Sequence, residues 1–211
     1  MHNFFTADYH LNHANMIKYC ARTLYMTKDD LDKYNYYKDK SKYEQKQFIV
    51  SKESLLKMNN GIRTNHNSRV KPGDTVFHIG DFLFKNSIGG KEGEGLPVKA
   101  SELLPMFNGK FIFILGNHDR NNSLKTPITN CRIRIGNKNI NLVHNPQWVD
   151  MNCEINLVGH VHTDWKFKRI IKDCKITDAI NVGVDQWNFY PITFEEILSK
   201  YNKWKRENNY K

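Results

Sequence analysis

The chain has 211 residues, of which 39% are hydrophobic and 26% charged, a composition typical of a soluble globular protein with one domain. No apolar run approaches the roughly 20 residues of a membrane-spanning helix, and no basic start followed by an apolar stretch marks a signal peptide, so we expect a cytoplasmic protein without a membrane partner. The formal net charge of +10 favours anionic partners such as nucleic acid, but dispersed lysines are equally typical of a solvated surface.

The first part of the chain predicts a strand, helices and a second strand. Asn3 to Ala7 predicts a strand and Ala14 to Cys20 a short helix. Arg22 to Tyr43 is rich in Lys, Asp and Tyr without a clear period, which indicates a surface excursion. Glu44 to Asn60 predicts a helix, and Thr75 to Ile79 the next strand. The expected core contacts of the second helix are Phe48, Leu55, Leu56 and Met58.

The second part predicts mostly strands and a terminal helix. Asn86 to Gly95 is glycine-rich and predicts a loop, and Ser101 to Phe107 predicts a short helix. Further strands are expected at Phe111 to Leu115, Arg132 to Ile135, Asn139 to Val143, Ile155 to Val158, Lys166 to Ile171 and Ala179 to Val184. Gly136-Asn137 indicates a hairpin. A capping box of Thr193 and Glu196 opens a helix over about 193 to 208. We treat residues 1 to 211 as a single domain.

Five of the apolar runs end in a group that can bind a metal ion. These groups are Asp8 with His10, Asp81, Asn117 with His118, His144, and His160 with His162. Ligands of α/β sheets gather outside the carboxyl ends of strands, so side chains far apart in sequence are expected to meet at one edge. A single Asp after a single strand would be weak evidence for a metal site. The prediction rests on the recurrence of such groups at the ends of five apolar runs.

Local spacing supports a shared site. A glycine stands directly before Asp81, Asn117 and His160, where a sharp turn could aim the next side chain into a cleft. In Asp8-Tyr9-His10 and His160-Val161-His162, the outer side chains point to the same face if the backbone stays extended. Each pair can then chelate one centre.

The ligand chemistry indicates two divalent ions. Imidazole and oxygen ligands without thiolate suit manganese, which we favour, and also Fe, Zn, Ni or Co. The candidates Asp8, His10, Asp81, Asn117, His144, His160 and His162 are too many for one tetrahedral ion. Two ions roughly 3.5–4 Å apart that share a carboxylate would use them all. The scattered Cys20, Cys131, Cys153 and Cys174 are expected to be reduced thiols.

The ordered motifs D-x-H, G-D, G-N-H-D, H and G-H-x-H resemble those of the calcineurin-like metallophosphoesterase superfamily. The opening segment from Thr6 to Asn15 and the segment from Asn181 to Trp187 look like those of its small stand-alone bacterial and phage members. The resemblance implies an α/β fold in which two mixed β-sheets pack as a sandwich flanked by helices. The strand pattern alone fits several α/β arrangements.

The resemblance also implies a role for each residue. The first metal would be held by Asp8, His10 and His162, and the second by Asn117, His144 and His160, with Asp81 bridging the two. His118 would act near the leaving group as a general acid or stabilise the transition state, and Asp119 would orient His118. A hydroxide bridging the two ions would attack the phosphorus atom in line with the leaving oxygen.

Three functions are compatible with this site. The first is a phosphodiesterase acting on a small ester, a nucleotide in particular, and the second is a nuclease acting on single-stranded or end-exposed DNA or RNA, with aromatic groups of Arg22 to Tyr43 stacking on bases. The third is a binding module that keeps the fold without turnover. The natural substrate and the oligomeric state do not follow from the sequence.

Other polar and aromatic residues have weaker assignments. His13 could contact a substrate phosphate or hydrogen-bond the following helix, and Arg120 could meet a phosphate or be solvated. His78 lies inside a strand and is expected to be a packed core histidine. His2 and His66 carry no pattern and are expected at the surface. The default expectation for Tyr9 and Trp187 is core packing.

Overall fold

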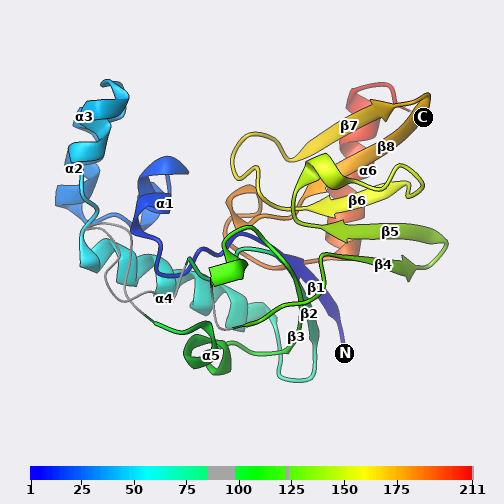
Figure 1. The fold of residues 1–211 in the computed structure, drawn as a ribbon, viewed down its shortest axis with the longest axis horizontal. Coiled ribbons are helices and arrows are strands. Elements are labelled where there is room, and N and C mark those ends of the chain that lie inside the picture. Colours follow the sequence, from blue (N-terminus) through cyan, green and yellow to red (C-terminus); the bar gives the residue numbers. More distant parts are fainter. Residues whose placement is uncertain (85–97, 122–123, 211) are drawn as a thin grey trace.

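The computed structural model describes residues 1–84, 98–121 and 124–210, so the loop predicted at Asn86 to Gly95 lies outside the described residues. Within the described part of the chain, no helix is both long and apolar enough to cross a membrane. The strands form two sheets, one with the order β3-β2-β1-β9 and the other with the order β4-β5-β6-β8-β7. Figure 1 shows the five-stranded sheet at one end of the molecule and helices α1 to α4 at the other.

The four-stranded sheet has a parallel centre. Its strands are β1 (Asn3–Thr6), β2 (Thr75–Ile79), β3 (Lys110–Ile114) and β9 (Ile192–Thr193). β1, β2 and β3 run parallel, and β9 is antiparallel to β1. The carboxyl ends of β1, β2 and β3 therefore meet at one edge, which is the condition that the predicted site requires.

The five-stranded sheet has the same plan. Its strands are β4 (Asn130–Ile135), β5 (Lys138–Val143), β6 (Ile155–Val158), β7 (Phe167–Lys172) and β8 (Lys175–Asn181). β5, β6 and β8 are parallel neighbours, while β4 and β7 form the antiparallel edges. Ile135 pairs with Lys138 across the predicted hairpin at Gly136-Asn137.

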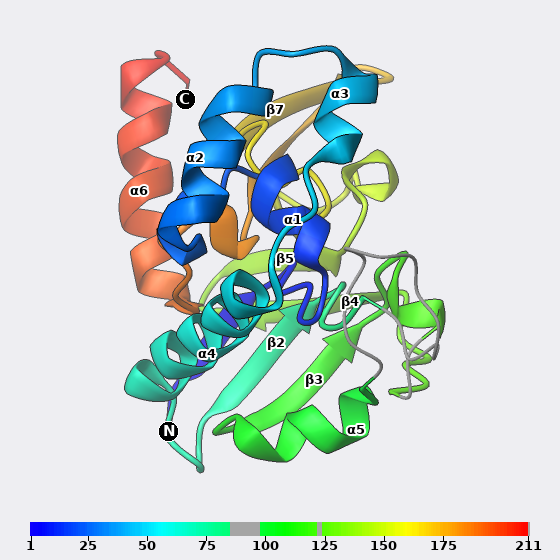
Figure 2. The same cartoon turned by 90° about the vertical axis from the view of Figure 1, so that its left-hand side faces the viewer.

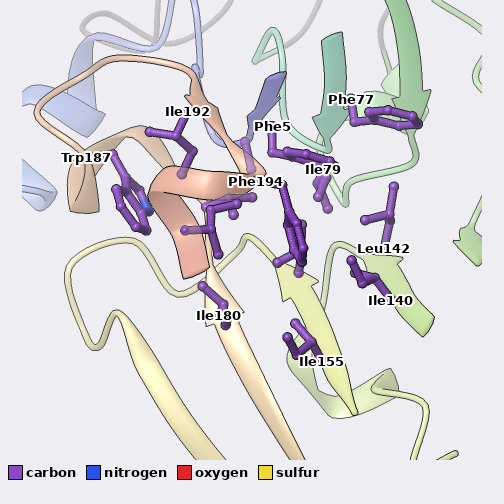
Figure 3. Close-up of a cluster of buried hydrophobic side chains, with 14 of the residues drawn as sticks. Phe5, Phe77, Ile79, Ile140, Leu142, Ile155, Ile180, Trp187, Ile192 and Phe194 are labelled. Carbon is purple, nitrogen blue, oxygen red and sulfur yellow. The ribbon is translucent and has the colours of Figure 1, made fainter. Parts of the chain in front are cut away.

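The main core lies between the two sheets (Figure 3). Because side chains alternate along a strand, Phe77 and Ile79 of β2 enter this core, whereas His78 points to the opposite face, where it meets the Phe82 and Tyr9 rings. From the other sheet, Leu142 and Leu157 complete the layer. The structure confirms the expected fold class of two mixed sheets packed as a sandwich and flanked by helices.

Helix α4 crosses the outer face of the four-stranded sheet in Figure 2, whereas α6 packs against the core between the two sheets. The helices are α1 (Ala14–Tyr19), α2 (Lys28–Tyr37), α3 (Lys42–Gln47), α4 (Lys52–Arg69), α5 (Ala100–Leu103) and α6 (Phe194–Glu207). Met58 and Ile62 of α4 pack with Ile17 of α1 in a second apolar cluster. At the chain end, α6 begins with the expected capping box of Thr193 and Glu196.

The prediction for the helix over Glu44 to Asn60 is wrong in two details. The helix expected over Glu44 to Asn60 is split into α3 and α4, because Ser51 caps the start of α4 and the Asp30 carboxylate accepts the Ser51 N–H and hydroxyl at 2.9 and 2.6 Å. Leu56, an expected core residue, is 41% exposed. The segment Arg22 to Tyr43 contains α2, whose start is capped by the Thr27 side chain.

Candidate metal centre

The loops at the carboxyl ends of five strands bring the predicted ligands together. Asp8 and His10 follow β1, Asp81 follows β2, Asn117 follows β3, His144 follows β5, and His160 and His162 follow β6. Among the described residues, Asp8, His10 and His162 form one group with ligand atoms within 4.8 Å of one another, and Asp81, His144 and His160 form another. The structure therefore joins side chains from both sheets into two adjacent groups.

The Asp81 carboxylate stands between the two groups. Its Oδ2 lies 3.4 Å from His10 Nε2 and 3.3 Å from His144 Nε2, so one oxygen faces an imidazole of each group. Its Oδ1 accepts the backbone N–H of His118 at 2.9 Å, which fixes the carboxylate plane. Asp81 has the position that a bridging ligand would need.

The second group contains a contact that calls for a cation. His144 Nδ1 lies 2.8 Å from the Ile79 carbonyl, which can only accept a hydrogen bond, so Nδ1 carries the proton. In the neutral imidazole, the Nε2 lone pair then faces Asn117 Oδ1 at 3.0 Å and Asp81 Oδ2 at 3.3 Å. His160 Nδ1 also lies 2.9 Å from Asn117 Oδ1. A proton or a metal ion must lie among these electron-rich atoms.

The first group has unpartnered nitrogens. His10 is 1% exposed, and neither of its ring nitrogens has a hydrogen-bond partner among the described residues. Both Asp8 oxygens accept the His160 N–H, at 3.1 and 2.9 Å, and Asp8 Oδ1 lies 3.9 Å from His10 Nε2. A buried polar atom without a partner costs about 1–3 kcal/mol, and because the Asp8 and Asp81 carboxylates flank this imidazole, it fits a metal ligand better than a core residue. The donor set fits divalent ions in both groups.

Electrostatics follow from burial and mutual proximity. Burial raises the pKa of the Asp8 carboxyl to about 6, against the lowering influence of His162 and His144. Burial would lower the pKa of His144, but its hydrogen bond to Asp81 and the Asp8 charge raise it to about 9. Burial holds the pKa of His10 well below its usual range. The raised pKa values of Asp8 and His144 mean that protons offset part of the carboxylate charge, a role that a divalent cation would take over.

The ligand-bearing backbone adopts the left-handed region. Asp8, His10, Asp81, His160 and His162 have φ angles of 60°, 48°, 60°, 72° and 41°. Non-glycine residues rarely adopt this conformation, and such strain concentrates at functional sites. The D-x-H and H-x-H pairs therefore converge through left-handed turns, and the extended backbone expected from their spacing is wrong.

The glycines of the motifs allow close approach. A Cβ on Gly116 would lie 2.1 Å from Asp81 Oδ1, and one on Gly159 would lie 2.8 Å from Asp8 Oδ2. Gly80 has φ +87°, and a Cβ there would lie 2.3 Å from His144 Nδ1. The left-handed turn expected of these glycines occurs at Gly80, while Gly116 and Gly159 leave room for the two carboxylates.

The predicted catalytic and substrate residues surround the same centre. The His118 ring is half-buried, with its centroid 5.0 Å from that of His10 and 5.9 Å from that of His13. His13 stacks on Phe84 at 3.7 Å, and burial lowers its pKa to about 3. Arg120 is exposed. Their roles in catalysis and substrate binding stay predictions.

Asp119 braces the site through the backbone. Its carboxylate accepts the N–H groups of Asp81 and Gly116, each at 2.8 Å, and that of Phe82 at 3.2 Å. It therefore joins the loop after β2 to the turn after β3. The orienting action on His118 stays a prediction.

Sequence reasoning missed three residues beside the first group, namely Cys20, Arg22 and Asp185. Cys20, His162 and Asp185 bring their ligand atoms within 4.8 Å of one another, and Arg22 forms an ion pair with Asp185. Asp185 follows the apolar run that ends at Val184, so the strand-end criterion used for the other ligands would have found it. Arg22 carried no signal, because its partner lies 163 positions away.

Other histidine and aromatic predictions had mixed outcomes. His66, expected at the surface, is fully buried, and its ring nitrogens contact the Tyr9 hydroxyl at 2.7 Å and the Asn108 carbonyl at 2.8 Å. His78 is a buried core histidine as expected, as are the aromatic rings of Tyr9 and Trp187.

Comparison with known proteins gives one sequence relative and one fold neighbour without an assigned function, and a more distant structure that is a phosphoesterase. No family model matches the chain. The chain is 26% identical to the uncharacterized protein MJ1445 of Methanocaldococcus jannaschii over 207 residues. The aligned region covers 96% of this chain and 92% of the relative. The chain shares its fold with AQ665 of Aquifex aeolicus, a protein of unknown function, with a TM-score of 0.54, 22% identity, and coverage of 93% and 97%. The phosphoesterase YfcE of E. coli has a TM-score of 0.34, 12% identity and coverage of 86% and 78%, a likeness that carries no argument about activity.

Proposed function

We propose that this protein is a metal-dependent phosphoesterase with two divalent ions at one centre. The observation that supports it most directly is the position of Asp81 Oδ2, 3.4 Å from an imidazole nitrogen of one ligand group and 3.3 Å from that of the other. A shared carboxylate between two sets of imidazole and oxygen ligands is the arrangement of two-metal hydrolases of phosphate esters. Asp8, His10 and His162 would hold one ion, and Asn117, His144 and His160 the other.

Bound ions would lower the pKa of a coordinated water and neutralise charge on the phosphate oxygens. The protein's own residues then have separate tasks. His118 donates an imidazole proton to the leaving oxygen as the P–O bond breaks, which is worth roughly 10²–10⁴-fold in rate. His13, packed on Phe84, faces the same space from the start of α1 and contacts the substrate phosphate. Asp119 holds the two ligand loops in register.

The substrate that we favour is a phosphodiester of a nucleotide. A dispersed basic charge of +10 attracts anions such as a nucleotide phosphate, and His118 would supply a proton to the leaving oxygen of the ester.

A nuclease is the second candidate, and a pocket supports it. The pocket has a volume of about 310 Å³ and is lined by Lys18, Tyr19, Tyr34, Tyr37, Lys38, Gln45 and Phe48. It lies among α1, α2 and α3, on the helix that begins beside His13. The Lys18 amine donates to the Gln45 and Phe48 carbonyls, while the tyrosine rings are suited to stacking on single-stranded nucleic acid and the Lys38 amine to pairing with its phosphates.

The test is a substrate panel on protein reconstituted with Mn²⁺, Zn²⁺, Ni²⁺ or Co²⁺. Bis-p-nitrophenyl phosphate, p-nitrophenyl phosphate, cyclic nucleotides, dinucleotides and single-stranded oligonucleotides separate diester, monoester and polymer cleavage. The His118→Ala variant should keep both ions and lose about 10²–10⁴-fold in kcat. Hydrolysis of none of these substrates with any of these metals would refute the enzyme and favour a binding module, and hydrolysis of the monoester alone would refute the diester preference. Full activity of His118→Ala would remove His118 from the mechanism.

A further inference from the structure

A buried arginine supports the first ligand group from behind. Arg22 is only 1% exposed, although burial of an arginine is rare unless its charge is paired. Its Nε and Nη2 donate to the two carboxylate oxygens of Asp185 at 2.8 and 2.9 Å. Nη2 also donates to the Asp8 carbonyl at 2.9 Å, and Nη1 donates to the Tyr9 carbonyl at 3.0 Å. One guanidinium therefore fixes both the D-x-H backbone and a distant carboxylate.

That carboxylate contacts a predicted metal ligand. Asp185 Oδ2 lies 3.2 Å from His162 Nδ1, and Asp185 is almost completely buried. A carboxylate accepts from Nδ1–H, so this contact selects the tautomer whose Nε2 lone pair is left for a cation. The ring is thereby directed toward Asp8 and His10, with which it forms a ligand group.

The cluster of Cys20, His162 and Asp185 is itself a poor cation site. Its ligand atoms lie within 4.8 Å of one another, yet both Asp185 oxygens already accept from the positively charged Arg22. A divalent ion there would have to displace a buried ion pair and approach a fixed cation. The cluster therefore supports the first ligand group and does not compete with it.

We infer that Arg22 and Asp185 are positioning residues that set the affinity of the ion held by Asp8, His10 and His162, and that Asp185, which acts through the His162 ring, acts on this ion alone. The inference rests on the proposed two-metal function. Arg22 holds the backbone that carries Asp8, and Asp185 holds the His162 ring, so together they position two of the three ligands of the first ion. Neither residue contacts Asn117, His144 or His160 through any hydrogen bond or ion pair described in the structure.

The test is calorimetric titration of the metal-free protein with Mn²⁺. The wild type is expected to bind two ions. Asp185→Asn should weaken one site about 10–100-fold and leave the other unchanged, as is typical for the partner of a metal-binding histidine. Arg22→Lys keeps the charge but loses the bidentate contact, and should weaken the same site less. The matched control is Asp178→Asn, because Asp178 accepts from Arg169 in the same bidentate manner at 2.9 and 3.0 Å, away from the site.

The outcomes separate this inference from the proposed function. If Asp185→Asn binds two ions with wild-type affinities, the positioning role is refuted, whatever the enzyme hydrolyses. If the wild type binds two ions but cleaves no ester, the proposed function fails, while selective loss of one ion in Asp185→Asn still supports the positioning role. Equal weakening by Asp178→Asn would attribute the effect to general destabilisation and refute the inference.

A second measurement needs no variant and covers the case in which Asp185→Asn does not fold. ¹⁵N NMR of histidine side chains in Zn²⁺-loaded wild type reports which ring nitrogen of His162 carries hydrogen. A proton on Nδ1 with zinc on Nε2 is expected, and the opposite arrangement would overturn the inference.

Discussion

Replacing Gly116 by alanine tests the site through a single added methyl group. The Cβ would lie 2.1 Å from Asp81 Oδ1 and 2.4 Å from the Asp81 backbone nitrogen. Ordinary contact begins near 3.4 Å, so Asp81 must retreat by more than about 1 Å or β3 must shift by as much. The Asp119 carboxylate accepts the N–H groups of both Gly116 and Asp81, so neither backbone segment can move away from the clash without breaking one of these hydrogen bonds.

The expected loss can be worked out from ligand geometry. A metal–carboxylate bond is about 2.0–2.2 Å long with a tolerance of roughly 0.2 Å, so a displacement of about 1 Å removes Asp81 from coordination. Loss of a residue that only supports a metal ligand lowers metal affinity by up to about 100-fold. Because Asp81 is itself a ligand and faces both groups, we expect both Mn²⁺ affinities to fall by at least this factor. Overpacking should also lower the free energy of unfolding by about 1–3 kcal/mol.

The assay is Mn²⁺ titration combined with urea unfolding of the metal-free protein. Gly73→Ala is the control, since a Cβ at Gly73 meets no atom within 4 Å. The control should match the wild type in both measurements. A Gly116→Ala protein that still binds two ions with wild-type affinity would refute the reasoning, because Asp81 could then not be a shared ligand in the observed arrangement.

Two further predictions concern stability away from the metal ions. Burial lowers the pKa of His66 to about 4, from an ordinary value of 6.5, so the folded state binds fewer protons than the unfolded state and stability falls as the pH drops from 6.5 toward 4. When the pH falls from 7.5 to 4.5, the free energy of unfolding should drop by about 2.5 kcal/mol more in the wild type than in His66→Gln. Equal drops for the two proteins in urea titrations would contradict this prediction. Tyr201→Phe removes a buried 2.6 Å hydrogen bond to Asp178 and should cost about 1.5–3 kcal/mol, and an unchanged urea midpoint would show that this hydrogen bond does not stabilise α6.

Much of the fold follows from short apolar runs and their ends. A run such as Thr75 to Ile79 is bounded by polar residues, and the structure places β2 over these residues. The sequence alone does not reveal where a helix breaks. Glu44 to Asn60 has enough apolar spacing for one helix, but the Ser51 side chain caps α4 by accepting the Ser54 N–H, and the Asp30 carboxylate accepts the Ser51 N–H and hydroxyl. Such tertiary contacts override local pattern.

The convergence of the candidate ligands was predictable, and its geometry was not. Asp81 and His144 follow strands of different sheets, so their closeness was expected from the family resemblance and not from the strand ends of one sheet. The left-handed backbone at Asp8 and His160 has no sequence signature, because neither is a glycine. His66 looked like a surface residue because nothing in sequence shows that Asn108 and Tyr9 satisfy both ring nitrogens.

The metal-free centre combines features that each oppose folding. Asp8 and Asp81 are buried near each other, and each repels the charge of the other. Neither ring nitrogen of His10 has a hydrogen-bond partner among the described residues. The ligand loops are held in place by contacts to backbone groups, from Asp119 on one side and Arg22 on the other. Hydrogen bonds to backbone fix the ligands, while the carboxylate charge is offset in part by protons on Asp8 and His144, which divalent ions would displace, adding stability as well as chemistry.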